Sequence, residues 1–263
     1  MLTERIFGFG LSLRRAIPKL FPRLVRLVVS SRVALQRRKN ERLSAREVFT
    51  RVYATNSWGG EKGIYCSGAG SQPAVADAYC RFVREFIREK QISRVVDLGC
   101  GDFRVGSRIA TPRISYIGVD VVDSLIQHNR EQHGTSQIQF LCLDISRDEL
   151  PPGELCLVRQ VFQHLSNSEI LAVLEKLSAY RYVLVTEHYP AHGRLTEYNR
   201  DKPHGADTRV IDNSAVCLDR PPFKVPGIRL ALEVPANLGL RNEGERLLTF
   251  LIENSGPGAS GLA

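Results

Sequence analysis

The residues best suited to chemistry lie in the stretch from Arg94 to Gly106, which reads RVVDLGCGDFRVG. An apolar run carries the carboxylate of Asp97 and passes at once into two glycines, Gly99 and Gly101. Glycine lets backbone N–H groups approach a ligand without interference from a Cβ atom, and a helix that follows would point its positive end at the same place. The pattern predicts a buried strand that turns into a helix around a bound ligand.

The stretch departs from a dinucleotide-binding fingerprint. Phe103 and Arg104 stand where the third glycine of G-x-G-x-x-G would fall, and that glycine normally admits a pyrophosphate against the helix. A ligand without phosphates therefore fits the turn better than a dinucleotide does.

Two further acids close the apolar runs that come next along the chain. Asp120 follows the run from Tyr116 to Val119, at the separation from Asp97 where nucleotide-binding folds place the acid that holds a ribose diol. Asp144 follows a third run and could accept a hydrogen bond from an adenine amine. These carboxylates are expected to flank one nucleoside.

The order of strand, D-x-G-x-G turn, helix, strand with acid, helix and strand with acid resembles the class I S-adenosylmethionine-dependent methyltransferases. The resemblance covers roughly residues 92–254. It implies an α/β fold with a doubly wound, Rossmann-like sheet of seven strands that ends in an antiparallel hairpin. It also implies S-adenosyl-L-methionine as the cofactor, bound by Asp97, Gly99, Gly101, Asp120, Asp144 and Gln160.

Two histidines follow the next two predicted strands. The run from Leu155 to Val158 leads to His164, and the run from Tyr182 to Thr186 leads to His188. Ligands in open α/β sheets bind at these carboxyl ends, and histidine is the natural base for a hydroxyl acceptor. His164 and His188 are therefore the candidate catalytic residues.

The second of these histidines also has a neighbour at a spacing found in metal sites. His188 and His192 have the spacing of a metal-binding pair on a helix, with Glu187 beside them. Pro190 lies between them and would disrupt that helix. The sequence favours an enzyme without a metal.

The segment from Pro190 to Pro226 has little periodicity and many polar residues. A segment of this length inside a compact domain is usually functional or disordered, and its position after the fifth strand predicts a substrate-binding insertion. His204, Asp207 and Arg209 are its candidate substrate-binding residues. Their polar character favours a small-molecule or glycan hydroxyl as the methyl acceptor.

Two regions of local structure precede the glycine turn. Ser44 and Glu47 form a capping box that predicts a short helix. The glycine-rich stretch that follows carries Trp58, the only tryptophan, and is interpreted either as a segment that closes over the cofactor or as an ordinary loop.

Three parts of the chain are expected: a basic amphipathic, helical segment at 1–43, a catalytic domain at 44–254 and a flexible tail at 255–263. The runs 229–234 and 246–253 predict the final hairpin of the domain. Six cysteines without a C-x-x-C pair indicate reduced thiols and a cytoplasmic protein.

The net charge of +8 is concentrated at the N-terminus, because residues 1–51 carry +10 and the remainder carries −2. The basic residues alternate with aliphatic ones, and no run is long enough to cross a bilayer. Residues 1–40 could bind an anionic membrane surface, act as an organelle transit peptide, or form a helix that covers the domain. Nucleic acid is the less favoured partner, because the arginines there alternate with aliphatic residues instead of with aromatic residues that stack on bases.

The leading hypothesis from the sequence is thus an O-methyltransferase, cytoplasmic or peripheral on the inner face of a membrane. An RNA or protein methyltransferase is the alternative within the same class. A non-catalytic subunit that binds a partner is the alternative outside it. The sequence leaves the oligomeric state open.

Overall fold

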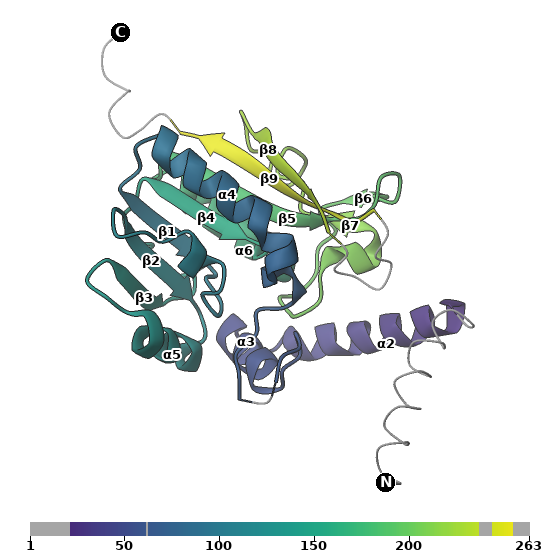
Figure 1. The fold of residues 1–263 in the computed structure, drawn as a ribbon. Coiled ribbons are helices and arrows are strands. Elements are labelled where there is room, and N and C mark those ends of the chain that lie inside the picture. The colour runs from purple at the N-terminus through teal and green to yellow at the C-terminus, as the bar shows by residue number, and fades with distance from the viewer. Residues whose placement is uncertain (1–21, 62, 237–243, 255–263) are drawn as a thin grey trace.

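The computed structural model describes residues 22–61, 63–236 and 244–254. Its main feature is a seven-stranded sheet in the order β3-β2-β1-β4-β5-β9-β8 (Figure 1). Strand β9 runs antiparallel to both β5 and β8, which confirms the expected doubly wound sheet with its final hairpin. The strands are β1 Arg94–Leu98, β2 Ser115–Asp120, β3 Ile138–Cys142, β4 Leu155–Arg159, β5 Tyr182–Tyr189, β8 Arg229–Pro235 and β9 Arg246–Glu253.

Helices cover both faces of the sheet, and alternate residues of each strand enter two separate cores. In β4, Cys156 and Val158 pack with α3 and α6, whereas Leu155 and Leu157 pack with α4. Burial on both faces explains why the strands read as continuous apolar runs. The helices are α2 Pro22–Asn40, α3 Ala45–Ala54, α4 Pro73–Glu89, α5 Asp123–His133 and α6 Asn167–Leu177.

Capping boxes begin two of these helices. The Ser44 side chain accepts from the backbone N–H of Glu47, and the Glu47 carboxylate accepts from the N–H of Ser44, as the sequence predicts. Ser166 and Glu169 form the same pair at the start of α6. These bonds satisfy backbone N–H groups at the start of each helix.

The helix expected directly after the glycine turn is absent, and that prediction is wrong. Only the short 3-10 turn Gly106–Arg108 follows β1 before β2 begins. Gly101 and Phe103 have φ of +56° and +57°, values that an α-helix does not accommodate. The Phe103 ring is instead buried edge-on against Phe140, with 4.8 Å between ring centroids. No helix dipole points into the turn from this segment.

The polar segment after β5 is folded and carries two short paired strands, β6 Glu197–Tyr198 and β7 Ser214–Ala215. The side chain of Asn199 ties it together by donating to the carbonyls of Cys217 and Pro221, at 2.8 Å each. The segment is therefore an ordered insertion within the domain.

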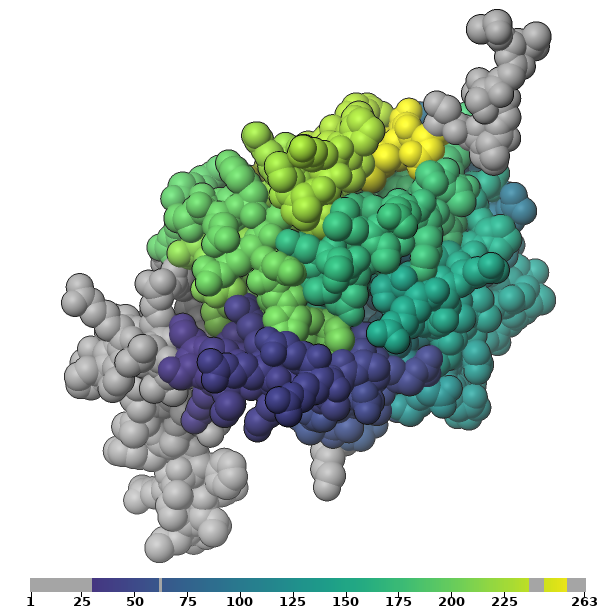
Figure 2. Space-filling view, turned by 180° about the vertical axis from the view of Figure 1, so that it is seen from behind, coloured from purple at the N-terminus to yellow at the C-terminus, as the bar shows by residue number. Residues whose placement is uncertain are grey.

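Helix α2 lies along this insertion, as Figure 2 shows where the purple helix borders the green segment. The side chain of Asn40 is 1% exposed and donates to the carbonyl of His204 at 3.0 Å. The described part of the basic segment is thus helical and docked on the domain. No helix in the described residues is long and apolar enough to cross a membrane. The expected tail, 255–263, lies outside the described residues.

Candidate active site

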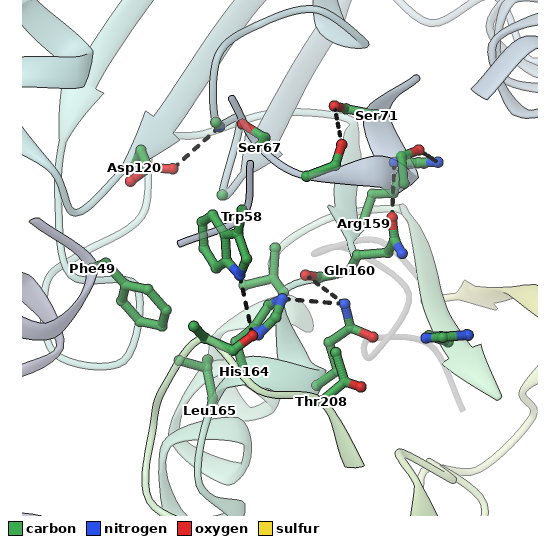
Figure 3. A pocket seen from close by; sticks show the side chains of 18 of the residues that line it. Phe49, Trp58, Ser67, Ser71, Asp120, Arg159, Gln160, His164, Leu165 and Thr208 are labelled. Atoms are coloured by element: carbon green, nitrogen blue, oxygen red, sulfur yellow. Dashed lines mark hydrogen bonds between the residues drawn. The ribbon is translucent and has the colours of Figure 1, made fainter. Parts of the chain in front are cut away.

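A cavity of about 870 Å³ lies at the carboxyl ends of the parallel strands (Figure 3). Its walls come from the glycine turn, the loop at 67–71, helix α3, the segment after β4 and residues 206–211 of the insertion. The structure brings all the predicted site residues to this cavity except His204 and Arg209.

The glycine turn connects β1 to the acid at the end of β2. The carboxylate of Asp120 accepts from the backbone N–H of Gly101 at 3.2 Å and from that of Val122 at 3.1 Å. These two donors hold the carboxylate in one orientation beside the cavity. The glycine turn and the second acid therefore lie in contact at the same edge of the sheet.

The two glycines are needed for packing as well as for conformation. A Cβ at Gly99 would lie 2.4 Å from a methyl of Val161, and one at Gly101 would lie 2.2 Å from the Ser67 hydroxyl. The Ser67 hydroxyl accepts from the backbone N–H of Asp102 at 2.7 Å. The glycines therefore admit the two neighbouring loops that shape the cavity, which is a role that the sequence pattern did not suggest.

Asp97 is buried and Asp120 is partly buried beside the cavity, and this shielding sets the ionisation of both carboxyls. Burial raises the pKa of Asp97 to about 6, although the hydrogen bond from the Tyr116 hydroxyl, at 2.7 Å, lowers it. Burial likewise raises the pKa of Asp120 to about 6, against its two N–H donors. A carboxylate in such a site is stabilised by a ligand that donates hydrogen bonds or carries positive charge.

Arg159, the last residue of β4, is the cation of the site. Its guanidinium stacks 5.0 Å from the centre of the Tyr79 ring and donates to the carbonyl of Gly70 at 2.7 Å. Its Nε is buried and has no hydrogen-bond partner among the described residues. An unused buried donor beside a cavity indicates a binding position for an anionic or carbonyl oxygen.

Gln160 follows Arg159 and takes a left-handed conformation, with φ of +56°. Its backbone N–H donates to the carbonyl of Thr186 at 2.7 Å, so the bend is anchored to β5. Its side chain rests on Gly70, where a Cβ would lie 1.8 Å from the amide oxygen. Gln160 thus lines the cavity, as predicted.

Asp144 also lines the cavity, and part of its carboxylate is already committed. One oxygen accepts from the backbone N–H of Ser146 at 3.0 Å and from its hydroxyl at 2.6 Å. The other oxygen lies 3.8 Å from Nε of Arg147. Only this second oxygen can accept the predicted hydrogen bond from an adenine amine.

An aromatic wall closes the cavity on the side of α3. The Trp58 ring lies 5.3 Å from Tyr53 and 5.1 Å from His164, centre to centre, and Phe49 lies behind it. The indole N–H donates to the carbonyl of Ala206 at 3.1 Å, which joins this wall to the insertion. Trp58 therefore lines the cavity, and closure of its segment over a cofactor stays a prediction.

Both ring nitrogens of His164 are engaged. Nδ1 lies 3.0 Å from the carbonyl of Gly205, and Nε2 lies 3.2 Å from the amide nitrogen of Gln163. Burial, together with the positive charge of Lys202, lowers its pKa to about 4. His164 is therefore neutral at neutral pH.

His188 reaches the cavity from β5 and is 4% exposed. Its Nε2 lies 3.1 Å from a carboxylate oxygen of Glu245, which precedes β9 and is 3% exposed. The neighbouring Glu187 points to the other side, where its carboxylate accepts from the backbone N–H groups of residues 161–163. Glu187 therefore shapes the loop after β4 and does not line the cavity.

The three predicted substrate-binding residues have other partners. Asp207 lines the cavity, yet its carboxylate binds Arg37 of α2 at 2.8 Å. His204 bridges Glu169 and the carbonyl of Leu43 and lies away from the cavity. It holds the insertion in place, so its expected contact with substrate is not met.

Arg209 is likewise away from the cavity, and its expected role is corrected. It is 1% exposed, and its guanidinium donates to the carbonyls of Phe162, Leu165 and Arg200. Every donor nitrogen is thus used within the protein. Arg209 is a structural cation that fixes the loop after β4 beneath the insertion.

The sequence did not single out several residues that line the cavity. These are Phe49 and Tyr53 of α3, Tyr79, Asp102, Arg159, Gln163, Thr208 and Glu245. The position of Arg159 at the end of a buried strand was the one available signal, since such ends face the ligand in this type of sheet. The others come from segments whose place beside the strands depends on tertiary contacts.

Among the described residues, no group of three or more His, Cys, Asp or Glu side chains could hold a metal ion. His192 is exposed and lies 4.0 Å from Glu233, outside the cavity. Independence from a metal stays a prediction.

No family model and no curated protein matches the chain. Among solved structures it is similar to the N-methyltransferase NodS from Bradyrhizobium japonicum bound to S-adenosyl-L-homocysteine, with 14% identity over 70% of this chain and 89% of that one, and a TM-score of 0.48. It is similar to human N-acetylserotonin methyltransferase bound to SAM, with 14% identity, 81% and 60% coverage and a TM-score of 0.48. It is also similar to magnesium protoporphyrin IX methyltransferase from Synechocystis, with 18% identity, 69% and 79% coverage and a TM-score of 0.42.

These likenesses are weak and assign neither a substrate nor a reaction to this chain. The topology itself is more specific, because five parallel strands are followed by a hairpin whose strand β9 lies antiparallel between β5 and β8. With its glycine turn and second acid at the carboxyl edge of this sheet, the chain has the fold of the class I S-adenosylmethionine-dependent methyltransferases.

Proposed function

We propose that the protein is an S-adenosylmethionine-dependent methyltransferase that methylates a hydroxyl group of a small molecule or glycan. The observation that carries the proposal is the distribution of charge around one cavity. The carboxylate of Asp120 lies on one side, and the cation of Arg159 lies across from it (Figure 3). A nucleoside joined to an amino acid has a ribose diol that binds a carboxylate and, at its other end, a carboxylate that binds a cation.

The residues present suit each part of the cofactor. Asp120 would accept hydrogen bonds from the ribose diol, and the second oxygen of Asp144 would accept from the adenine amine. The unused Nε of Arg159 suits the amino-acid carboxylate, and the buried carboxylate of Asp97 suits the ammonium group.

The bound cofactor supplies a sulfonium that makes its methyl group electrophilic. The chain's own residues then have to align the acceptor, exclude water and remove a proton. Trp58 and Ala206, joined by a hydrogen bond, cover the cavity from two segments far apart in sequence. The cavity also contains two imidazoles, one of which can take the acceptor proton.

The insertion presents a mainly apolar surface to the acceptor. Its lining residues include Ala206, Val210 and Ile211, with Thr208 as the hydroxyl among them. Most of the polar side chains that suggested sugar recognition bind other parts of the protein instead. Together with Trp58, this surface favours an acceptor with an apolar face, such as the C–H face of a sugar ring or an aryl group.

The cofactor assignment is tested by calorimetry with S-adenosylhomocysteine. Asp120→Ala should lose about 1.5–3 kcal/mol of binding free energy, as for a charge-assisted hydrogen bond. Asp123→Ala is the matched control, because Asp123 is exposed three residues away and does not line the cavity. Equal affinities in these two variants would refute the assignment.

The reaction is tested by methyl transfer from labelled cofactor to a panel of monosaccharides, glycans, phenols, RNA and protein. The cavity covered by α3 and the insertion favours a small acceptor. Label recovered only in RNA or protein would support the alternative within the methyltransferase class. Cofactor binding without transfer to any acceptor would favour a partner-binding subunit.

A further inference from the structure

The two histidines of the cavity differ in which nitrogen atoms they can offer. His164 uses both, because Nδ1 meets the Gly205 carbonyl and Nε2 meets the Gln163 amide nitrogen. The carbonyl requires a proton on Nδ1, and Nε2 then accepts from the amide. His164 would have to lose the hydrogen bond at Nε2 before it could take a proton from an acceptor.

His188 has one nitrogen held and the other available. Its Nε2 lies 3.1 Å from Oε2 of Glu245, and both side chains are almost fully buried. A carboxylate oxygen can only accept, so Nε2 carries the proton and the lone pair lies on Nδ1. Nδ1 makes no hydrogen bond with any residue that the structure describes, and His188 lines the cavity.

The position of His188 in the sheet places it near the cofactor end of the cavity. Thr186 is paired with Arg159 in the parallel register of β5 and β4. Thr186 and His188 lie two residues apart on one strand, so their side chains share a face of the sheet with that of Arg159. His188 therefore lies on the same face of the sheet as Arg159, two residues closer to the carboxyl end of β5 than the residue that pairs with Arg159. We assign Arg159 to the cofactor.

Glu245 is fixed in place by the hairpin. Its carbonyl accepts from the backbone N–H of Ala236 at 2.7 Å, which extends the pairing of β8 with β9. The residue before it, Gly244, has φ of +78°, and a Cβ there would lie 3.2 Å from Ala191. The backbone hydrogen bond of Glu245 and the turn at Gly244 therefore hold its carboxylate beside His188.

We propose that His188 takes the acceptor proton and that Glu245 is its positioning residue. This inference rests on the proposed function. As the acceptor oxygen forms its bond to the methyl carbon, the carbon–sulfur bond breaks and leaves neutral S-adenosylhomocysteine. The hydroxyl proton passes to Nδ1 of His188, and the carboxylate of Glu245 faces the resulting imidazolium at Nε2.

The first test measures the tautomer without any turnover. Long-range ¹⁵N–¹H correlation spectra should show His188 protonated at Nε2 and not at Nδ1. Glu245→Gln should keep this tautomer, because the amide oxygen still accepts, whereas Glu245→Ala should release it to a mixture. A proton found on Nδ1 in the native protein would overturn the proposal.

The second test separates turnover from binding. His188→Gln should lower kcat by about 100-fold or more, the range for loss of a general base, and leave the affinity for S-adenosylhomocysteine within about twofold. Glu245→Gln should lower kcat by about 10- to 100-fold with KM little changed, and Glu245→Asp should restore part of it. His192→Gln is the control, because its side chain is exposed outside the cavity.

The outcomes distinguish this inference from the function on which it rests. Normal cofactor affinity with full turnover in His188→Gln would overturn the role of His188 alone. Loss of cofactor affinity in that variant with unchanged kcat would make His188 a cofactor-binding residue instead. If the native protein binds no S-adenosylhomocysteine, the proposed function fails and this inference fails with it.

Discussion

Arg37 donates two hydrogen bonds to a single carboxylate oxygen of Asp207, at 3.0 Å from Nε and 2.8 Å from Nη2. Its Nη2 also donates to Asp212 at 2.6 Å. Asp207 lies within the segment of the insertion that lines the cavity, and Asp212 follows directly after it. Helix α2 therefore positions one wall of the cavity.

Replacing Arg37 by alanine should destabilise this wall. The two partner side chains are only 15% and 22% exposed, so the variant leaves two partly buried carboxylates without their cation. We expect the free energy of unfolding to fall by about 2–3 kcal/mol, measured by urea titration, and turnover to fall with it.

Arg38→Ala is the matched control for this prediction. Arg38 is the next residue of α2, it is exposed, and it makes no hydrogen bond or ion pair with the described part of the chain. Equal stability in the two variants would show that the contacts of Arg37 do not support the insertion.

The glycines of the turn should respond to substitution according to their surroundings. Gly99 and Gly193 both have φ of +76°, but a Cβ at Gly193 meets nothing within 4 Å, whereas one at Gly99 collides with Val161. Gly193→Ala should cost about 1–2 kcal/mol of stability from the left-handed backbone alone. Gly99→Ala should cost more, and its affinity for S-adenosylhomocysteine should fall at least about tenfold because the loop after β4 must shift.

Calorimetry measures the affinity of the Gly99→Ala and Gly193→Ala variants for S-adenosylhomocysteine, and thermal unfolding measures their stability. Similar losses in both would mean that backbone strain alone explains the glycine at 99. The contact with Val161 would then have no part in shaping the cavity.

The strands and the acids that line the cavity could be predicted because their signals are local. Buried parallel strands are continuous apolar runs, and the acids Asp97, Asp120 and Asp144 follow from their place at strand ends. The helix expected after the glycine turn failed for a local reason as well. Phe103 takes a positive φ so that its ring can enter the core, and the sequence pattern does not reveal that choice.

The insertion was harder to interpret because its polar residues have partners far away in the sequence. Arg209 binds the carbonyls of Phe162 and Leu165, and His204 binds Glu169 and Leu43. Spacing cannot distinguish a side chain that binds substrate from one that satisfies buried carbonyls. Glu245 was missed for the same reason, since only the pairing of β5 with β9 brings it to His188.

Cofactor affinity should depend on pH through the two buried acids. The ribose diol and the ammonium group need ionised carboxylates, and burial raises the pKa of both Asp97 and Asp120 to about 6 in the ligand-free protein. Affinity for S-adenosylhomocysteine should therefore fall as the pH decreases below about 6, by about tenfold per pH unit for each carboxyl. Calorimetry between about pH 4.5 and 8 measures this slope, because this interval includes the titration of both carboxyls.

Stability should change in the opposite direction. Because both folded-state pKa values are raised, these carboxyls favour the ligand-free fold most below about pH 4, and this contribution is lost as the pH rises through about 6. Asp120→Asn should remove one titrating group, which makes both slopes shallower. An affinity that is flat across this range would show that neither carboxylate contacts the cofactor.

The last prediction concerns the basic N-terminal segment, which we propose binds an anionic membrane surface. Arg37 and Asn40 hold the insertion, so a deletion of residues 1–40 would damage the site along with the segment. A deletion of residues 1–21 keeps these contacts and removes four of the basic residues. Each cation near anionic lipid contributes about 1 kcal/mol, so the shorter deletion should weaken co-sedimentation with phosphatidylserine vesicles by about 100-fold or more. Methyl transfer to a soluble acceptor should be unchanged, and the full-length protein should detach as salt rises. If the full-length protein fails to co-sediment at low salt, or if the deleted protein binds as well as the full-length one, the segment is not a membrane anchor. Its role is then limited to the contacts that α2 makes with the insertion.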